Sequence, residues 1–199
     1  MGYYPGATAV GIKVKEGVIL AADKRVMYGF SLMSKAGKKV FRITDKIGFA
    51  SAGFIADMQT IARSMEVEIK LYELDTGNPI RVANAAKLLS VIMYNRRLFP
   101  YLAEVVIGGV DDMGSHIFVL DPIGALIEDD YTALGTGAQL AISIIENEYS
   151  ENLDIEAARS LAIKSIKAAI SRDAASGDGI DVLTITGTKV NEEFIPIKI

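Results

Sequence analysis

The order in which strands and helices follow one another constrains the fold of this chain more than any other feature of its sequence. The chain opens with strand-like runs that come in pairs. Residues 8–14 alternate, and Gly17 separates them from the apolar run 18–22. Two such runs joined by a glycine-bearing turn are typical of a β-hairpin. Residues 40–43 and 47–51 repeat this arrangement.

The helices that follow also come as a pair. Apolar residues at helical spacing predict a first helix over about 58–72. A second helix is predicted from Asn78-Pro79 to about Phe99, because Asn is a good cap and Pro fits the first helical position. Residues 85–93 are apolar nearly all round, so we expect this helix to be covered on more than one side.

The rest of the chain repeats this alternation of strand groups and helix pairs. The predicted elements are strands from about 103 to 134, helices at 138–148 and 154–172, and strands at 181–186 and 193–197. Because the strands do not alternate singly with helices, a doubly wound parallel sheet is disfavoured. We expect an α+β fold of two antiparallel sheets, with a helix pair on each outer face.

The composition narrows the classes of function. A length of 199 residues fits one domain. The chain has no cysteine and a single histidine, His116, which we expect at a turn or a strand end. A triad of His with Ser or Cys, and a zinc site of several His or Cys ligands, are therefore disfavoured. The formal net charge of -4 gives no reason to expect a nucleic-acid partner or an acidic lipid surface.

No targeting or membrane segment is expected. Residues 1–6 have neither the basic region nor the apolar region of a signal peptide. No run of about 18 uncharged apolar residues occurs that could span a membrane. The lack of cysteine favours a reducing, intracellular environment, so we expect a cytoplasmic protein.

Four short motifs group carboxylate, amine and hydroxyl side chains. They are Ala7-Thr8-Ala9-Val10-Gly11, Ala21-Ala22-Asp23-Lys24-Arg25, Lys35-Ala36-Gly37-Lys38-Lys39 and Ser171-Arg172-Asp173-Ala174-Ala175-Ser176-Gly177. Each motif alone is a weak signal. Asp23 and Lys39 by themselves would be interpreted as an ordinary salt bridge, and Gly177 as the end of a helix.

In this order and spacing, the motifs resemble the β subunits of archaeal-type 20S proteasomes. Further segments extend the likeness over nearly the whole chain: Ser51-Ala52-Gly53, Phe99-Pro100-Tyr101, Ile107-Gly108-Gly109 and Gly135-Thr136-Gly137. The resemblance implies the N-terminal-nucleophile hydrolase fold, a four-layer αββα sandwich, as a single domain over residues 7–199. It favours a β subunit, because α subunits carry an extra helix before the first strand.

The resemblance also implies partners and a substrate class. β subunits form seven-membered rings, and two β rings lie between two α rings in a barrel. A regulatory ATPase acts at the α ring, and unfolded proteins are hydrolysed inside the chamber. We therefore expect α subunits, other β copies and a second, catalytic β subunit as partners, and no metal or organic cofactor.

Alanine occupies the position of the family's nucleophile. In the family a propeptide is cut at a Gly–Thr bond, and the exposed Thr hydroxyl attacks the substrate, assisted by its own α-amine or a nearby Lys. The matching residue is Ala7, directly after Gly6. Alanine has no oxygen, so we expect residues 1–6 to stay attached as a short uncleaved segment, whether or not Met1 is removed. Thr8 is a poor replacement, because a shift of one residue turns a side chain to the opposite face of a strand, away from the Lys and Asp partners.

Most supporting residues of the family site have a match in this chain. By the resemblance, Asp23 holds the charge of Lys39, and that charge favours a neutral, basic amine nearby. Asp173 and Ser176 match the pair that orients the N-terminal group. Thr136 stands where the family usually has Ser, and it keeps the hydroxyl.

Two further positions concern the substrate side of the site, and a third departs from the family pattern. Gly53 matches the glycine whose N–H helps to form the oxyanion hole. Met27 stands where the family usually has a Thr that contacts the substrate backbone, although its main chain could still pair with an extended peptide. Ala138, after Gly137, departs from the usual Ser.

Three functions are compatible with these residues. The first is a non-catalytic β subunit in a mixed ring, beside an active β subunit. The second is an active threonine endopeptidase subunit into which the alanine was engineered. The third is a homo-oligomeric assembly module without a proteolytic role. Departures from the active pattern at Ala9, Met27 and Ala138 favour a natural loss of the nucleophile.

Overall fold

The first sheet is built on the N-terminal hairpin. The structure is a computed structural model that describes residues 6–197, and in it β1 (Thr8–Val14) and β2 (Gly17–Asp23) pair antiparallel. The sheet is completed by β10 (Tyr131–Gly135), β11 (Gly179–Thr186) and β12 (Val190–Pro196), in the order β10-β1-β2-β11-β12. Every residue of the central strand β2 is buried, because each of its faces is covered by another layer.

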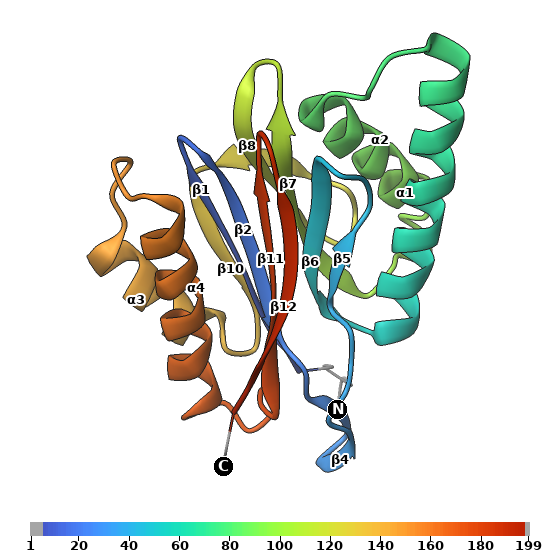
Figure 1. Cartoon of the computed structure of the whole chain (residues 1–199). Helices are drawn as coiled ribbons and strands as arrows, with labels where there is room; N and C mark the ends of the chain where they lie inside the picture. Colours follow the sequence, from blue (N-terminus) through green and yellow to red (C-terminus); the bar gives the residue numbers. More distant parts are fainter. Residues whose placement is uncertain (1–5, 198–199) are drawn as a thin grey trace.

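The second sheet lies against the first (Figure 1). Its strands are β5 (Val40–Arg42), β6 (Ile47–Gly53), β7 (Ala103–Asp111), β8 (Gly114–Leu120) and β9 (Leu126–Asp129), which neighbour one another in chain order. All pairs are antiparallel, as the hairpin pattern predicts. A separate two-stranded hairpin, β3 (Val26–Tyr28) with β4 (Ser31–Ser34), was not predicted.

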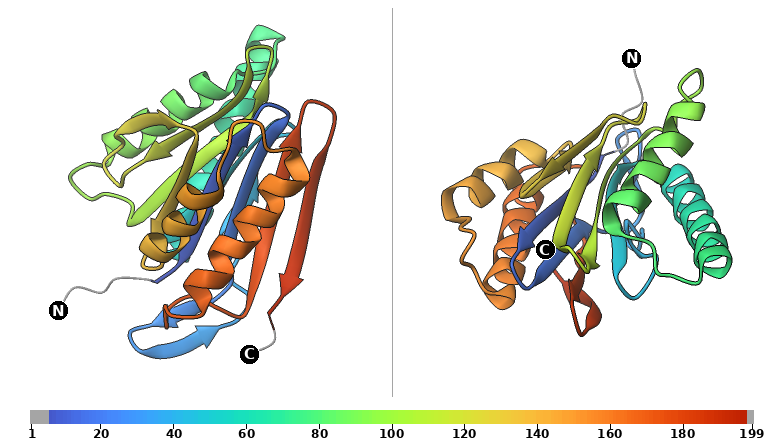
Figure 2. Two further views of the ribbon diagram at one scale, coloured as in Figure 1. Left: turned by 90° about the vertical axis from the view of Figure 1, so that its left-hand side faces the viewer. Right: turned by 90° about the horizontal axis from the view of Figure 1, so that it is seen from above.

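Among residues 6–197, four helices cover the outer faces of the two sheets. They are α1 (Ile55–Thr76), α2 (Val82–Asn95), α3 (Ala138–Glu148) and α4 (Ile155–Ile170). Figures 1 and 2 show α1 and α2 on the second sheet and α3 and α4 on the first. None of the helices in residues 6–197 combines the length with the apolar character that a membrane-spanning helix needs.

In the described part of the chain, three apolar clusters fill the three interfaces between these layers. One joins α1 and α2 to the second sheet through residues such as Phe49 and Leu89. A second lies between the sheets, with Leu20 and Val106. The third joins the first sheet to α3 and α4 and includes Ile166. The prediction of a four-layer αββα sandwich is confirmed.

The predicted bounds of the second helix were wrong at both ends. The helix begins at Val82, whose N–H donates to Asp111 Oδ2 at 2.8 Å, and Asn78 instead uses its side-chain amide on the Thr76 carbonyl at 2.9 Å. The first turn of α2 is therefore bonded from strand β7, which lies far away in the sequence. The helix ends at Asn95, and residues 96–99 form a turn.

Candidate active site

Strand β1 presents successive residues to opposite sides of its sheet. Ala7 and Ala9 belong to the core between the sheets, whereas Val10 belongs to the core under α3 and α4. The Thr8 hydroxyl lies on the helix side, since a side chain added at Gly137 would meet it at 2.1 Å. Both Ala7 and Thr8 are fully buried. The alternation expected for this strand therefore separates the methyl group of Ala7 from the hydroxyl of Thr8.

Asp23 and Lys39, here termed the lysine cluster, form a buried ion pair. Lys39 Nζ lies 2.7 Å from Asp23 Oδ1, and the two side chains are 1% and 0% exposed. The Asp23 carboxylate also accepts hydrogen bonds from the N–H groups of Thr8 (2.9 Å), Arg25 (2.8 Å) and Gly177 (3.0 Å). The carboxylate thus joins the start of β1 to the end of β2 and to the loop after α4.

Burial dominates the electrostatics of Lys39. It lowers the pKa of the ammonium group, because desolvation disfavours the charged form, and the nearby charge of Asp23 opposes only part of this effect. A lysine of this kind gives up its proton more readily than an exposed lysine. Such an amine is suited to assist proton transfer at a neighbouring hydroxyl or amine.

A second set of polar side chains, here termed the hydroxyl cluster, lies on the helix side of β1. Its members are Thr8, Thr136, Asp173 and Ser176. Asp173 Oδ2 accepts from the hydroxyls of Thr136 and Ser176, both at 2.6 Å. Because the single proton of Ser176 is directed at this carboxylate, the 2.7 Å contact between the hydroxyls of Thr8 and Ser176 is donated by Thr8.

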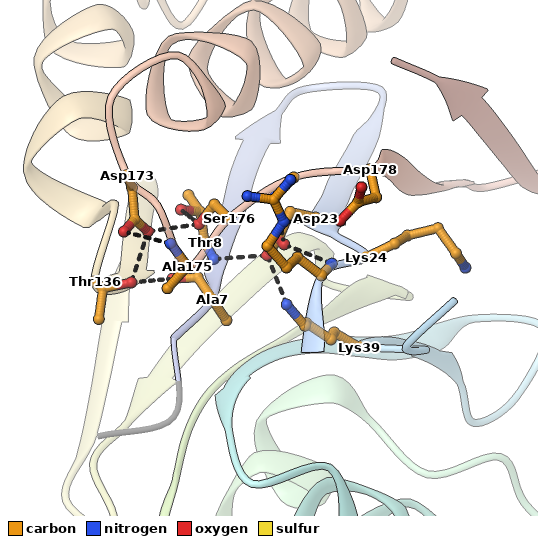
Figure 3. A network of polar contacts seen from close by, with 12 residues as sticks. Ala7, Thr8, Asp23, Lys24, Lys39, Thr136, Asp173, Ala175, Ser176 and Asp178 are labelled. Atoms are coloured by element: carbon orange, nitrogen blue, oxygen red, sulfur yellow. Dashed lines mark hydrogen bonds and ion pairs between the residues drawn. The ribbon is translucent and has the colours of Figure 1, made fainter. Parts of the chain in front are cut away.

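Figure 3 shows the two clusters close together around the start of β1. Thr136 also reaches the backbone of Ala7, with its hydroxyl 3.4 Å from the Ala7 carbonyl oxygen. Ser176 contacts the side chain of Thr8, while the resemblance assigns it to orienting the N-terminal group. The structure thus brings together Ala7, Asp23, Lys39, Thr136, Asp173 and Ser176.

A cavity of about 590 Å³ opens beside this centre and contains the two predicted substrate-side residues. It is lined by Gly6, Arg25, Val26, Met27, Tyr28, Met33, Lys39, Gly53, Phe54, Ile55 and Ala56. Gly53 has a φ of +140°, and a Cβ there would lie 2.1 Å from the Leu102 carbonyl oxygen. Only glycine fits this backbone position, which keeps the N–H of Gly53 near the cavity.

Gly6 is packed tightly where the chain enters β1. A Cβ at this position would lie 1.9 Å from the Cβ of Ala175, so a larger residue would force the loop after α4 to move. Residues 1–5 lie outside the described part of the chain, so the expectation that residues 1–6 remain attached stays a prediction.

Sequence reasoning missed a clamp that holds the loop after α4. Arg25 Nε donates to Asp178 Oδ2 at 2.8 Å, and its Nη1 donates to the Ala174 carbonyl at 2.9 Å. Asp178 has a φ of 69°, a left-handed conformation that Asp and Asn tolerate better than most residues. Arg25 belongs to the motif Ala21-Ala22-Asp23-Lys24-Arg25, and an Asp directly before Gly179 is a typical turn signal. The sequence therefore draws attention to each residue, although not to the contact between them.

The other predictions for single residues can be placed on the structure. His116 is the third residue of β8, inside the strand and not at the turn or strand end that was expected, and its Nδ1 lies 2.8 Å from Glu128 Oε1. Among residues 6–197, no group of three or more His, Cys, Asp and Glu side chains is arranged to hold a metal ion.

Comparison with known proteins agrees with this geometry. The family model described as "Proteasome subunit" matches residues 3–185. Proteasome subunit beta 2 of Thermofilum pendens is 59% identical over 197 residues, covering 99% of this chain and 96% of that protein. Proteasome subunit beta 2 of Pyrobaculum arsenaticum is 55% identical over 194 residues, covering 98% and 96%. Proteasome subunit beta 1 of Ignicoccus hospitalis is 54% identical over 181 residues, covering 91% of each chain. The chain belongs to the proteasome subunit family, among the β subunits of the archaeal type.

Proposed function

We propose that this chain is a non-catalytic β subunit of a 20S proteasome core particle, and that it shapes or modulates a ring in which a second β subunit supplies the active threonine. One observation carries the proposal: a methyl group stands at Ala7, the position that matches the nucleophile, beside the buried pair of Lys39 and Asp23. Lys39 can assist a proton transfer, but no hydroxyl is attached where the attacking atom is needed.

The neighbouring hydroxyl does not replace the missing one. Thr8 donates its hydroxyl proton toward Ser176, on the far side of the strand from the cavity residues Lys39 and Gly53. Its backbone N–H is bonded to Asp23 and is part of a peptide bond, so it offers no free amine as a base. These contacts support a structural role for Thr8.

The presence of the buried pair Asp23 and Lys39 is compatible with a subunit whose role lies in assembly. Removing one member of a buried ion pair leaves the other charge unpaired, which is costly even in a subunit that performs no chemistry. The similar proteins carry the numbered names beta 1 and beta 2, which fits rings with more than one kind of β chain. Under this proposal the partners are α subunits, an active β subunit and further β copies in seven-membered rings. A regulatory ATPase acts at the α ring, and unfolded proteins are the substrates of the assembled particle.

The test compares the chain with Ala7 and the variant Ala7→Thr, each purified alone and after assembly with an α chain and a partner β chain. We expect the Ala7 chain to show no peptidase activity of its own, either alone or in the assembled particle. Its intact mass should still include the segment before Ala7. Peptide hydrolysis by the Ala7 chain alone would overturn the proposal. Thr8→Val in the same chain is the matched control, because it identifies Thr8 as the source if activity is found.

The same experiment separates the two other functions. The intact framework of Asp23, Lys39, Asp173 and Ser176 favours an engineered active subunit as the second candidate. That candidate requires Ala7→Thr to cut its own propeptide and to gain peptidase activity. Co-assembly with α chains into a cylinder, measured as particle mass, excludes an assembly module unrelated to proteolysis.

A further inference from the structure

The β3–β4 hairpin has a cationic side chain at each of its two ends, and both side chains pair with the same carboxylate. Arg25 comes directly before β3 and Lys35 directly after β4. Arg25 Nε lies 2.8 Å from Asp178 Oδ2, and Lys35 Nζ lies 3.7 Å from Asp178 Oδ1. The Asp178 side chain is 3% exposed, so its contact with Arg25 is screened less than a surface pair. The base of the hairpin is therefore attached to one point of the loop after α4.

Backbone hydrogen bonds connect the same segments. The N–H of Gly37, just after the hairpin, donates to the Lys24 carbonyl at 3.0 Å, and the Lys24 N–H donates to the Gly177 carbonyl at 3.1 Å. Gly177 also packs against the guanidinium group, since a Cβ there would lie 2.5 Å from Arg25 Cζ. The hairpin base, the residues after β2 and the loop after α4 thus form one continuous set of contacts.

The loop that is held in this way carries polar groups of both clusters. Asp173 and Ser176 belong to the hydroxyl cluster, and the N–H of Gly177 donates to Asp23 of the lysine cluster at 3.0 Å. Figure 3 shows Asp173, Ser176 and Asp178 on one loop beside the start of β1. Asp178 has a φ of 69°, and a residue other than glycine keeps such a conformation only where its surroundings hold it. Loss of the clamp should therefore release the whole loop.

The hairpin beyond its base is mostly exposed. Figure 1 shows β4 projecting beyond the ends of the two sheets. Tyr28, Phe30 and Met33 are 71%, 95% and 70% exposed, and none of residues 26–34 belongs to the three apolar clusters. Segments with few buried apolar contacts open locally at a small cost in free energy. The contacts at the base therefore decide whether the hairpin stays in place.

We propose that Asp178 couples the β3–β4 hairpin to the loop after α4, so that the two segments open and close together. In the closed state, which is the one described, Asp178 binds both ends of the hairpin, and the loop supplies Asp173, Ser176 and the Gly177 N–H to the two clusters. In the open state these contacts are lost together. A partner that packs on the closed hairpin therefore stabilises the hydroxyl cluster by the same coupling free energy. The coupling does not depend on the side chain at position 7, so it goes beyond the proposed function.

Hydrogen exchange of single amides in the full-length chain, followed by NMR, tests the coupling. The Gly37 N–H reports on the hairpin base, and the Gly177 N–H reports on the loop. We expect similar protection factors for the two amides, because one opening event exposes both. Asp178→Asn should lower both factors together, by about fivefold, since a hydrogen bond to a charged acceptor is replaced by a weaker one. Faster exchange of one amide without the other would refute the coupling.

Glu193→Gln is the control for a general loss of stability. It weakens another arginine–carboxylate pair, that of Arg159 and Glu193, which joins α4 to β12 and contains no residue of the hairpin or the loop. We expect the protection of Gly37 and Gly177 to stay unchanged in this variant. If Glu193→Gln accelerated both amides as much as Asp178→Asn does, the two would exchange through unfolding of the whole chain, and a local unit would be excluded.

A matched pair of lysines tests the coupling from the hairpin side. Lys35 Nζ lies 3.7 Å from Asp178, and Lys38 Nζ lies 3.8 Å from Glu192; the two side chains are 67% and 54% exposed. Lys35→Met should lower the protection of the Gly177 N–H by about twofold, a small factor because exposed ion pairs contribute little. Lys38→Met should leave it unchanged. Equal effects of the two substitutions would show that Asp178 is not the point of coupling.

The coupling and the proposed function fail in different ways. Peptide hydrolysis by the chain with Ala7 would refute the proposed function and leave the exchange results as they are. Independent exchange of Gly37 and Gly177 would refute the coupling alone.

Discussion

The lysine cluster and the hydroxyl cluster lie on opposite sides of one strand and differ in how completely their hydrogen bonds are satisfied. In the hydroxyl cluster each hydroxyl proton has an acceptor, and Asp173 accepts from both Thr136 and Ser176. In the lysine cluster Asp23 accepts four hydrogen bonds, whereas Lys39 donates a single bond within residues 6–197. By the resemblance, a hydroxyl at position 7 would lie beside the lysine cluster, where the described residues leave Lys39 with a single hydrogen bond.

Under the proposed function the residue at position 7 decides the chemistry, and the contacts of the two clusters explain how the rest of the site stays in place. The two clusters share the backbone of β1, since Asp23 binds the Thr8 N–H and Thr136 contacts the Ala7 carbonyl. The framework is therefore held in place without any contribution from the side chain of residue 7. A chain with this arrangement can keep its fold without a nucleophile at position 7. Substitutions in the two clusters should therefore lower the free energy of unfolding to different degrees.

Asp23→Ala is expected to have the largest effect. It removes the acceptor of four hydrogen bonds and leaves the Lys39 ammonium group buried without a partner. Breaking a buried ion pair in this way costs about 3–5 kcal/mol. Urea denaturation should therefore show that the free energy of unfolding falls by this amount.

The control for this prediction removes both charges. Asp23→Leu combined with Lys39→Met should regain part of the loss, because replacing a buried pair by apolar residues is often neutral or stabilising. A loss of less than about 1 kcal/mol in Asp23→Ala would contradict the prediction, since it would mean that Lys39 becomes neutral at little cost.

Ser176→Ala should have an intermediate effect within the hydroxyl cluster. It leaves the buried Thr8 hydroxyl without its acceptor, and an unsatisfied buried polar group costs about 1–3 kcal/mol. Thr8→Val is the matched variant, because it removes the donor and keeps the bond from Ser176 to Asp173. Its cost should be smaller, about 1 kcal/mol. Stability is measured by thermal or urea unfolding. A larger loss in Thr8→Val than in Ser176→Ala would show that Ser176 donates to Thr8.

Strand periodicity is the part of the site that sequence reasoning predicts well. It separates Ala7 from Thr8 because the side-chain alternation of a strand is a local property. The helix α3 is predicted over its full length, Ala138–Glu148, since its apolar pattern is regular. The roles assigned to Asp23, Lys39 and Gly53 come from a resemblance in spacing, and they stay predictions until catalysis is measured.

Contacts between distant segments account for most of what could not be predicted. The start of α2 depends on Asp111, which lies on another strand. The clamp between Arg25 and Asp178 joins residues 153 positions apart, and no local pattern indicates which carboxylate an arginine will bind. The β3–β4 hairpin is short and exposed, so it lacks the apolar alternation that marks the longer strands.

Asp178→Asn should have a smaller effect that depends on pH. The hydrogen bond from Arg25 holds the pKa of the Asp178 carboxyl below its usual range. Its stabilising contribution is therefore present above the unfolded pKa, about 3.9, and is lost as the pH falls through the lower folded value. Asn tolerates the left-handed backbone of this position, so the variant removes the charge alone.

At neutral pH we expect Asp178→Asn to cost about 1 kcal/mol, the difference between a charged and a neutral hydrogen-bond acceptor. The gap between the two proteins, followed as urea midpoints, should be constant from about pH 5 to pH 8 and should narrow below about pH 4. A gap of constant size across the whole series would mean that the charge of Asp178 contributes nothing.

Arg81→Gln is expected to have the smallest effect, although Arg81 binds Asp112 through two donors, one of them Nε at 2.8 Å. The two side chains are 54% and 61% exposed, so water replaces the lost contact and salt screens the attraction. Unfolding midpoints at low and high salt should match those of the natural chain within error. If this variant lost as much stability as Asp178→Asn, the number of hydrogen bonds, and not their burial, would govern the energetics of these pairs.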